Sequence, residues 1–163
     1  MSPACHHALC PMTASLMRAK YNPPVTSVSP ITRSSLPKHS PIAVPLPMAE
    51  LPTRVWSDDQ WEQIRLECLA DSMDEKWDVF VEGQVAHLHR SWTGFEIFEA
   101  AFSAVDGGWR IETAVVESDP SRYHHRSERF ARVMLELVFS NILLREPAVD
   151  LRAELVTLMR STP

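Results

Sequence analysis

The side chains best suited to chemistry lie together in one short stretch of the chain. They are His87, His89, Arg90, Ser91, Trp92 and Thr93. Residues two apart on a strand share a face, so His87 and His89 present both imidazoles on one side, a geometry that metal ions can use. The sequence places no carboxylate beside them, so we interpret them as ordinary strand histidines and predict no metal site and no cofactor.

Ser91 and His89 also share a face, as a nucleophile and its base would. The sequence around Ser91 lacks a nucleophile elbow and an orienting acid, which argues against that chemistry. We therefore name no catalytic residue.

Arg90 and Trp92 lie on the other face of the same predicted strand. A guanidinium beside an indole offers a stacking surface and a planar set of donors, which suits an anion, a carboxylate or a base-like ring. The alternative is that the Arg90 stem covers core aromatic residues at the sheet edge. Lys76 and Trp77 should lie nearby, because a hairpin brings its open ends together. The ligand-binding candidates are Lys76, Trp77, His89, Arg90, Ser91, Trp92 and Thr93.

Four strands are predicted to carry these residues. Alternating apolar positions indicate strands over 76–82, 84–92, 95–104 and 109–117, the last with Trp109, Ile111, Thr113 and Val115 on one face. Glu82-Gly83, Thr93-Gly94 and Asp106-Gly107-Gly108 are typical turn sequences. Three short connections in a row predict an antiparallel meander.

Helices are predicted before and after the meander in the sequence. Ser57 and Gln60 form a capping-box pattern at the start of a helix over 57–72. An amphipathic helix over 127–145 and a last helix after Pro147 follow the strands. The fold class is therefore α+β, with two C-terminal helices packed on one face of a four-stranded sheet. Residues 137–144 are apolar nearly all round, which predicts a central position or a homodimer contact through helix 127–145.

Charge and proline divide the chain at Met48. The 163 residues carry 16 Lys and Arg against 21 Asp and Glu, a net charge of −5, but residues 1–47 contain four basic and no acidic residues. Nine of the 13 prolines also lie there, so we predict a disordered head over 1–47 and a single α+β domain over 48–163. The head is interpreted as a sequence upstream of a true start at Met48, with a functional tail or a transit peptide as alternatives.

Composition excludes some classes of partner. The acidity of 48–163 argues against nucleic acid, because phosphate neutralisation needs a basic face. The most apolar stretch, 133–144, is too short to span a bilayer, so no membrane partner is predicted. Three cysteines, Cys5, Cys10 and Cys68, make no disulfide framework, and we predict a cytoplasmic location.

The pattern Lys76-Trp77, Arg90-Ser91-Trp92-Thr93-Gly94 and Asp119-Pro120 with Tyr123 resembles a known group of sequences. These are small uncharacterised bacterial proteins, similar stretches of which occur beside ADP-ribosyl-glycohydrolase modules in longer chains. The resemblance spans about 74–144 and implies that residues 90–94 are the place to look for a site. It carries over no catalytic role.

The sequence therefore favours a small binding module without its own catalysis, for a protein partner or a small anionic ligand. The first alternative is a hydrolase that acts on an ADP-ribose-like or other anionic substrate through Arg90 and His89. The second is a structural subunit that forms a homodimer through helix 127–145.

Overall fold

The computed structural model describes residues 38–66, 69–70 and 74–161 as one α+β unit. Its elements, in chain order, are β1 (Pro45–Pro47), α1 (Asp58–Ile64), β2 (Trp77–Glu82), β3 (Val85–Arg90), β4 (Glu96–Val105), β5 (Gly108–Glu117), α2 (Glu128–Leu137), the π-helix η2 (Val138–Leu143) and α3 (Val149–Ser161).

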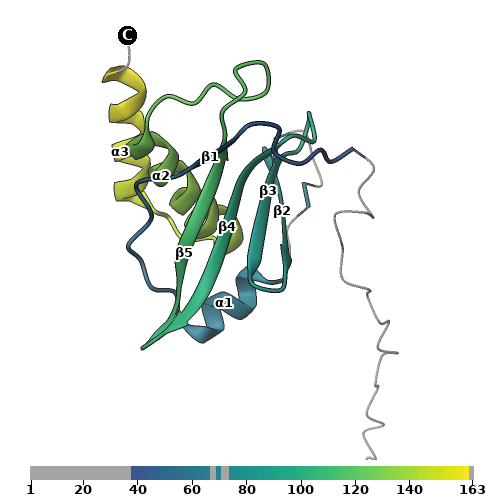
Figure 1. Cartoon of the computed structure of the whole chain (residues 1–163). Coiled ribbons are helices and arrows are strands. Elements are labelled where there is room, and N and C mark those ends of the chain that lie inside the picture. Colours follow the sequence, from purple (N-terminus) through teal and green to yellow (C-terminus); the bar gives the residue numbers. More distant parts are fainter. Residues whose placement is uncertain (1–37, 67–68, 71–73, 162–163) are drawn as a thin grey trace, which may run out of the picture.

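The strands form one antiparallel sheet in the order β1-β5-β4-β3-β2 (Figure 1). Strands β2 to β5 are joined by short turns, so the predicted meander is confirmed. In its first hairpin Trp77 pairs with Arg90 and Asp78 with His89. Trp77 and Arg90, from the first two parts of the sequence pattern, are thus neighbours across the sheet.

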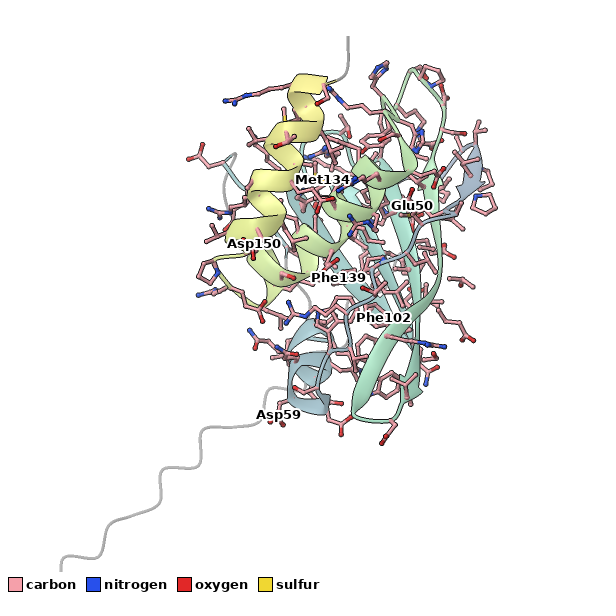
Figure 2. The ribbon with its side chains drawn as sticks, turned by 90° about the vertical axis from the view of Figure 1, so that its left-hand side faces the viewer. Glu50, Asp59, Phe102, Met134, Phe139 and Asp150 are labelled. Atoms are coloured by element: carbon pink, nitrogen blue, oxygen red, sulfur yellow. The ribbon has the colours of Figure 1, made fainter. Side chains whose placement is uncertain are left out.

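The helices α2 and α3 lie on one side of the sheet, and α1 lies at the end nearest the β4–β5 turn (Figures 1 and 2). Alternate residues of the central strands, such as Leu88 and Phe98, face these helices and form the core with Leu135 and Phe139. Phe139 meets Phe102 of β4 edge to face, with 5.2 Å between ring centroids, at the junction of helix and sheet (Figure 2).

The sheet has five strands rather than the predicted four. The additional strand β1 pairs with β5 and lies within residues 1–47, the segment expected as a disordered head. Pro45 and Pro47 are compatible with an edge strand, which leaves one row of backbone groups unpaired. Of that head, residues 38–47 are described and lie along the sheet, whereas residues 1–37 lie outside the described residues.

The first two helices differ from their predicted bounds, beginning with α1. The capping box at Ser57 and Gln60 is present, but α1 ends at Ile64 rather than at residue 72, and Leu66 is exposed. Ala70, within the predicted helix, donates its amide to the Asp78 carboxylate at 2.8 Å instead. Residues 67–68 and 71–73 of that prediction lie outside the described residues.

The predicted helix 127–145 is α-helical only to Leu137 and continues as the π-helix η2. Val138, Phe139 and Leu143 of η2 are buried within the single chain. The nearly continuous apolar character of 137–144 is therefore explained by a central position.

A β-bulge changes the predicted faces of β5. The pairing shifts between Ala101 and Phe102, because Ala101 pairs with Thr113 and Phe102 with Ile111. The additional residue, Glu112, reverses the alternation, so the buried apolar side chains are those of Ile111, Ala114 and Val116 rather than that of Val115 with Thr113 on the same face.

None of the helices in the described ranges is long and apolar enough to cross a membrane.

Candidate functional site

Arg90 at the end of β3 lies between two tryptophans. Its guanidinium carbon is 4.1 Å from the ring centre of Trp77 and 5.6 Å from that of Trp92. Trp77 is buried in the core, whereas 58% of Trp92 is exposed. The guanidinium thus stacks on a fixed ring and a solvent-accessible ring, an arrangement that holds its plane in one orientation.

The turn after Arg90 is closed by its own polar groups. Gly94 donates its amide to the Arg90 carbonyl at 2.7 Å, and the Thr93 hydroxyl accepts from the Phe95 amide at 3.3 Å. Ser91 donates its hydroxyl to the Glu75 carbonyl at 2.6 Å, which ties the turn to the start of β2. Ser91 and Thr93 therefore position the Arg90 turn, and their hydroxyls are engaged with the backbone.

A cavity of about 330 Å³ opens beside Arg90, between the end of the sheet, the β5–α2 loop and the helices α2 and α3. Its lining residues are Arg90, Arg122, Tyr123, His124, Arg126, Phe130, Met134 and Met159. Three arginines and a histidine line it together with apolar side chains, and no described lining residue is acidic. The composition of the wall favours an anion.

The arginines of this cavity differ in how they are paired. Arg122 binds the buried carboxylate of Glu117 at 3.0 Å and is thereby neutralised. In the described part of the chain, Arg90 and Arg126 make no ion pair, and both stack on aromatic rings instead. Burial lowers the pKa of Arg90 from its ordinary value, because water no longer fully solvates its charge.

Tyr123 provides a hydroxyl in the same wall. Its oxygen is buried and has no hydrogen-bond partner within the described ranges. Burial raises the pKa of Tyr123, while the charges of Arg90 and Arg126 act to lower it. A neutral phenol can donate a hydrogen bond, as the two neighbouring guanidinium groups can. A bound oxyanion would accept that hydrogen bond and so provide the missing partner of the hydroxyl.

The predicted candidates thus separate into two groups. Trp77, Arg90 and Trp92 are brought together, and Lys76 is next to them, where it lines a second cavity of about 350 Å³ with Trp77 and Ile142. His89 is on the opposite face of the sheet, buried, with its ring stacked on His39 at 4.4 Å. His89 therefore does not share a cavity with Arg90, as the alternation along a strand requires.

The face that carries His89 holds a second polar cluster. His39 stacks on His89 and has its Nε2 atom 2.9 Å from the Asp78 carboxylate. On the neighbouring position of the same face, His87 Nδ1 is 2.6 Å from Glu96 Oε1 and 3.8 Å from Glu99 Oε2. One donor atom from each of His87, Glu96 and Glu99 lies within 4.8 Å of the others, so these residues have the spacing of metal ligands.

Sequence reasoning missed several of these residues. Glu96 and Glu99 are scattered carboxylates of a predicted strand, which we interpret from the sequence as part of a solvated face, yet Glu96 is fully buried. Tyr123 enters only through the resemblance, and the sequence does not single out Arg126 as a site residue. The Asp119-Pro120-x-x-Tyr123 spacing is the sequence signal that could identify Tyr123, because it marks a loop that returns toward the sheet.

Comparison of the chain with family models, with curated proteins and with solved structures finds no match in any of the three. The functional conclusions therefore rest on the geometry of the Arg90 cavity and of the polar cluster on the opposite face of the sheet.

Proposed function

We propose that this protein is a binding module for a small anionic ligand, whose phosphate or carboxylate group is held in the Arg90 cavity. The observation that carries the proposal is the half-buried Arg90 guanidinium, which faces a cavity without acidic lining residues and is paired with no described carboxylate. An arginine that loses hydration without gaining a counter-ion is poised to bind an anion.

The bound group would accept hydrogen bonds from Arg90, Arg126 and the Tyr123 hydroxyl. A volume of about 330 Å³ is at the lower end of the range for small-ligand sites, so it holds the anion and the part of the ligand next to it. The rest of the ligand would then extend toward exposed Trp92, whose ring offers a stacking surface. A ligand that joins an anion to a planar ring, as ADP-ribose does, fits this division.

Binding is tested by calorimetry on the full chain with ADP-ribose, inorganic phosphate and adenosine, which lacks the anion. We expect ADP-ribose to bind, phosphate to compete with it, and adenosine alone to bind far more weakly. Arg90→Gln should weaken ADP-ribose binding by roughly 10- to 100-fold, the worth of a hydrogen bond to a charged group. The matched control is Arg110→Gln, which removes an exposed arginine of β5 far from the cavity. Equal losses in both variants would refute the site.

Tyr123→Phe separates binding from folding. Its hydroxyl has no hydrogen-bond partner within the described ranges, so its removal should leave the melting temperature unchanged or slightly higher. The same change should weaken phosphate and ADP-ribose binding about 5- to 10-fold. A variant that melts earlier but binds as before would show that the phenol supports packing alone.

The hydrolase alternative relies on Arg90 and His89, which lie on opposite faces of the sheet, so any hydrolysis would have to depend on Arg90 without His89. A separate assay tests it: release of ribose 5-phosphate from ADP-ribose, or of ADP-ribose from an ADP-ribosylated peptide, that is abolished by Arg90→Gln would show that the protein is an enzyme. Light scattering of the full chain tests the homodimer, and a cytoplasmic location is tested by fractionating the native host.

A further inference from the structure

We propose that His87, Glu96 and Glu99 form a binding site for one divalent transition-metal ion, on the face of the sheet opposite the Arg90 cavity. The three residues come from two adjacent strands. His87 of β3 pairs with Glu99 of β4, and Glu96 lies three residues away on β4, beyond a bulge between Leu88 and His89. The inference is independent of the anion site, because it uses none of its residues.

The donor set selects the class of metal. One imidazole nitrogen and two carboxylate oxygens suit Mn²⁺, Fe²⁺ or Zn²⁺ better than Ca²⁺, which takes six to eight oxygens. Three protein ligands leave coordination positions for water or a substrate. Rigid strands hold all three backbones, so the ligands do not depend on a loop.

The two distances from His87 are close to those between the ligands of a bound metal. Metal bonds of about 2.0–2.2 Å at tetrahedral angles place ligand atoms roughly 3.3–3.6 Å apart. The observed separations from His87 Nδ1 are 2.6 Å to Glu96 and 3.8 Å to Glu99, on either side of that value. Replacing the proton between His87 and Glu96 by a metal ion would lengthen the first distance and shorten the second.

Two of the three ligands, His87 and Glu96, have neighbouring groups of the kinds that orient metal ligands. The other ring nitrogen of His87, Nε2, has the Glu82 carboxylate 3.9 Å away. The second oxygen of Glu96 accepts a hydrogen bond from the Ile42 amide at 3.2 Å. Ligating histidines commonly direct their second nitrogen to a carboxylate, and ligating carboxylates are themselves hydrogen-bonded. His87 and Glu96 are also buried, which limits competition from bulk water.

The experiment titrates the full chain, stripped with a chelator, with Mn²⁺ and follows free Mn²⁺ by electron paramagnetic resonance. Mn²⁺ is chosen because the cysteines and histidines of the Cys5–Cys10 segment favour softer metals. We expect one saturable site, weakened at least about tenfold by Glu99→Gln, which neutralises the most accessible ligand. Glu112→Gln, which changes an exposed carboxylate of β5 to the same amide, should bind as the unaltered chain does.

Glu99→His distinguishes a ligand from a mere negative charge. It retains a donor atom and should keep Mn²⁺ affinity well above that of Glu99→Gln, although the net charge of the two variants is the same. Circular dichroism confirms that each variant is folded. Absence of saturable Mn²⁺ binding by the unaltered chain, or equal effects of Glu99→Gln and Glu112→Gln, would overturn the proposal.

Discussion

At the scale of single residues, Gly94 shows how the Arg90 turn and the segment before β1 depend on each other. Its φ of +72° is in the left-handed region, and a Cβ there would lie 1.8 Å from the Lys38 carbonyl oxygen. Ser40 also donates to the Gly94 carbonyl at 2.8 Å. Only glycine allows the backbone of residues 38–40 to lie this close to the turn.

Replacement of this glycine should therefore be costly. Gly94→Ala must both strain the backbone, by roughly 1–2 kcal/mol, and displace the Lys38 backbone, so we expect a loss above about 3 kcal/mol in the free energy of unfolding. Gly83→Ala is the matched control, because Gly83 has a similar φ of +63° but open space where the methyl group of an alanine would lie. Urea denaturation of both variants measures the difference. Equal losses would contradict the close approach.

At the scale of elements, the segment 38–47 completes the sheet and covers buried charge. The carboxylate of Glu117 is fully buried and accepts hydrogen bonds from the amides of Ala43 at 2.7 Å and Val44 at 3.0 Å. Burial alone would raise the pKa of Glu117, but these amides, that of Asp119 and the charge of Arg122 outweigh it and lower the pKa. The strand β1 follows directly and pairs with β5.

Truncation tests the importance of this segment. A chain that begins at Met48 loses β1 and two of the donors to Glu117, which leaves a buried carboxylate less satisfied. We expect its melting temperature to fall by about 10 °C or more relative to a chain that begins at Lys38. Equal melting temperatures for the two chains would show that residues 38–47 contribute nothing to stability.

The π-helix η2 is the second element that joins distant parts. Ser140, buried in η2, accepts a hydrogen bond from Arg54 at 3.0 Å, and the same guanidinium forms an ion pair with Glu146 at 2.6 Å. Gln60 of α1 also reaches Glu146, at 3.1 Å. The wider turns of η2 therefore lie beside α1, the segment before α1 that contains Arg54, and the segment before α3 that contains Glu146.

At the scale of the whole molecule, several carboxylates stabilise the fold only when ionised. Hydrogen bonds from arginines lower the pKa of Glu146 through Arg54 and that of Glu154 through Arg129, and the pKa of Glu117 is lowered as described above. A group whose folded pKa is depressed contributes stability above its unfolded pKa, about 4.3 for glutamate. That contribution disappears as the pH falls through the folded value.

We therefore expect the stabilisation from these three carboxylates to be nearly constant from pH 7 to 5 and to be lost below about pH 4, so the free energy of unfolding should fall in acid. Urea denaturation at a series of pH values measures the profile. Glu117→Gln should unfold more easily at pH 7 and show a shallower fall in acid, because its amide does not titrate. Thr113→Ser, an exposed change on the same strand, is the control and should keep the original slope. A profile in Glu117→Gln parallel to that of the unaltered chain would contradict this role for Glu117.

Local patterns in the sequence are sufficient for the meander. Alternation and glycine turns predict β2 to β5, and the pairing of Trp77 with Arg90 follows from the hairpin between them. The capping box at Ser57 is equally readable, because a cap involves only residues close in sequence. The end of α1 at Ile64 has no such local signal, and beyond it the Ala70 amide binds the carboxylate of Asp78 in β2.

The candidate site, like the fold, is predictable from the sequence only where its residues are close together in the chain. Spacing along the chain is enough to single out Arg90 and Trp92 as a pair, because their relation is local. The strand β1, the burial of Glu96 and Glu117, and the return of Tyr123 to Arg90 all depend on contacts between residues far apart in the chain. No periodicity encodes such contacts, since their free energy arises only when the sheet, loop and helices are packed together.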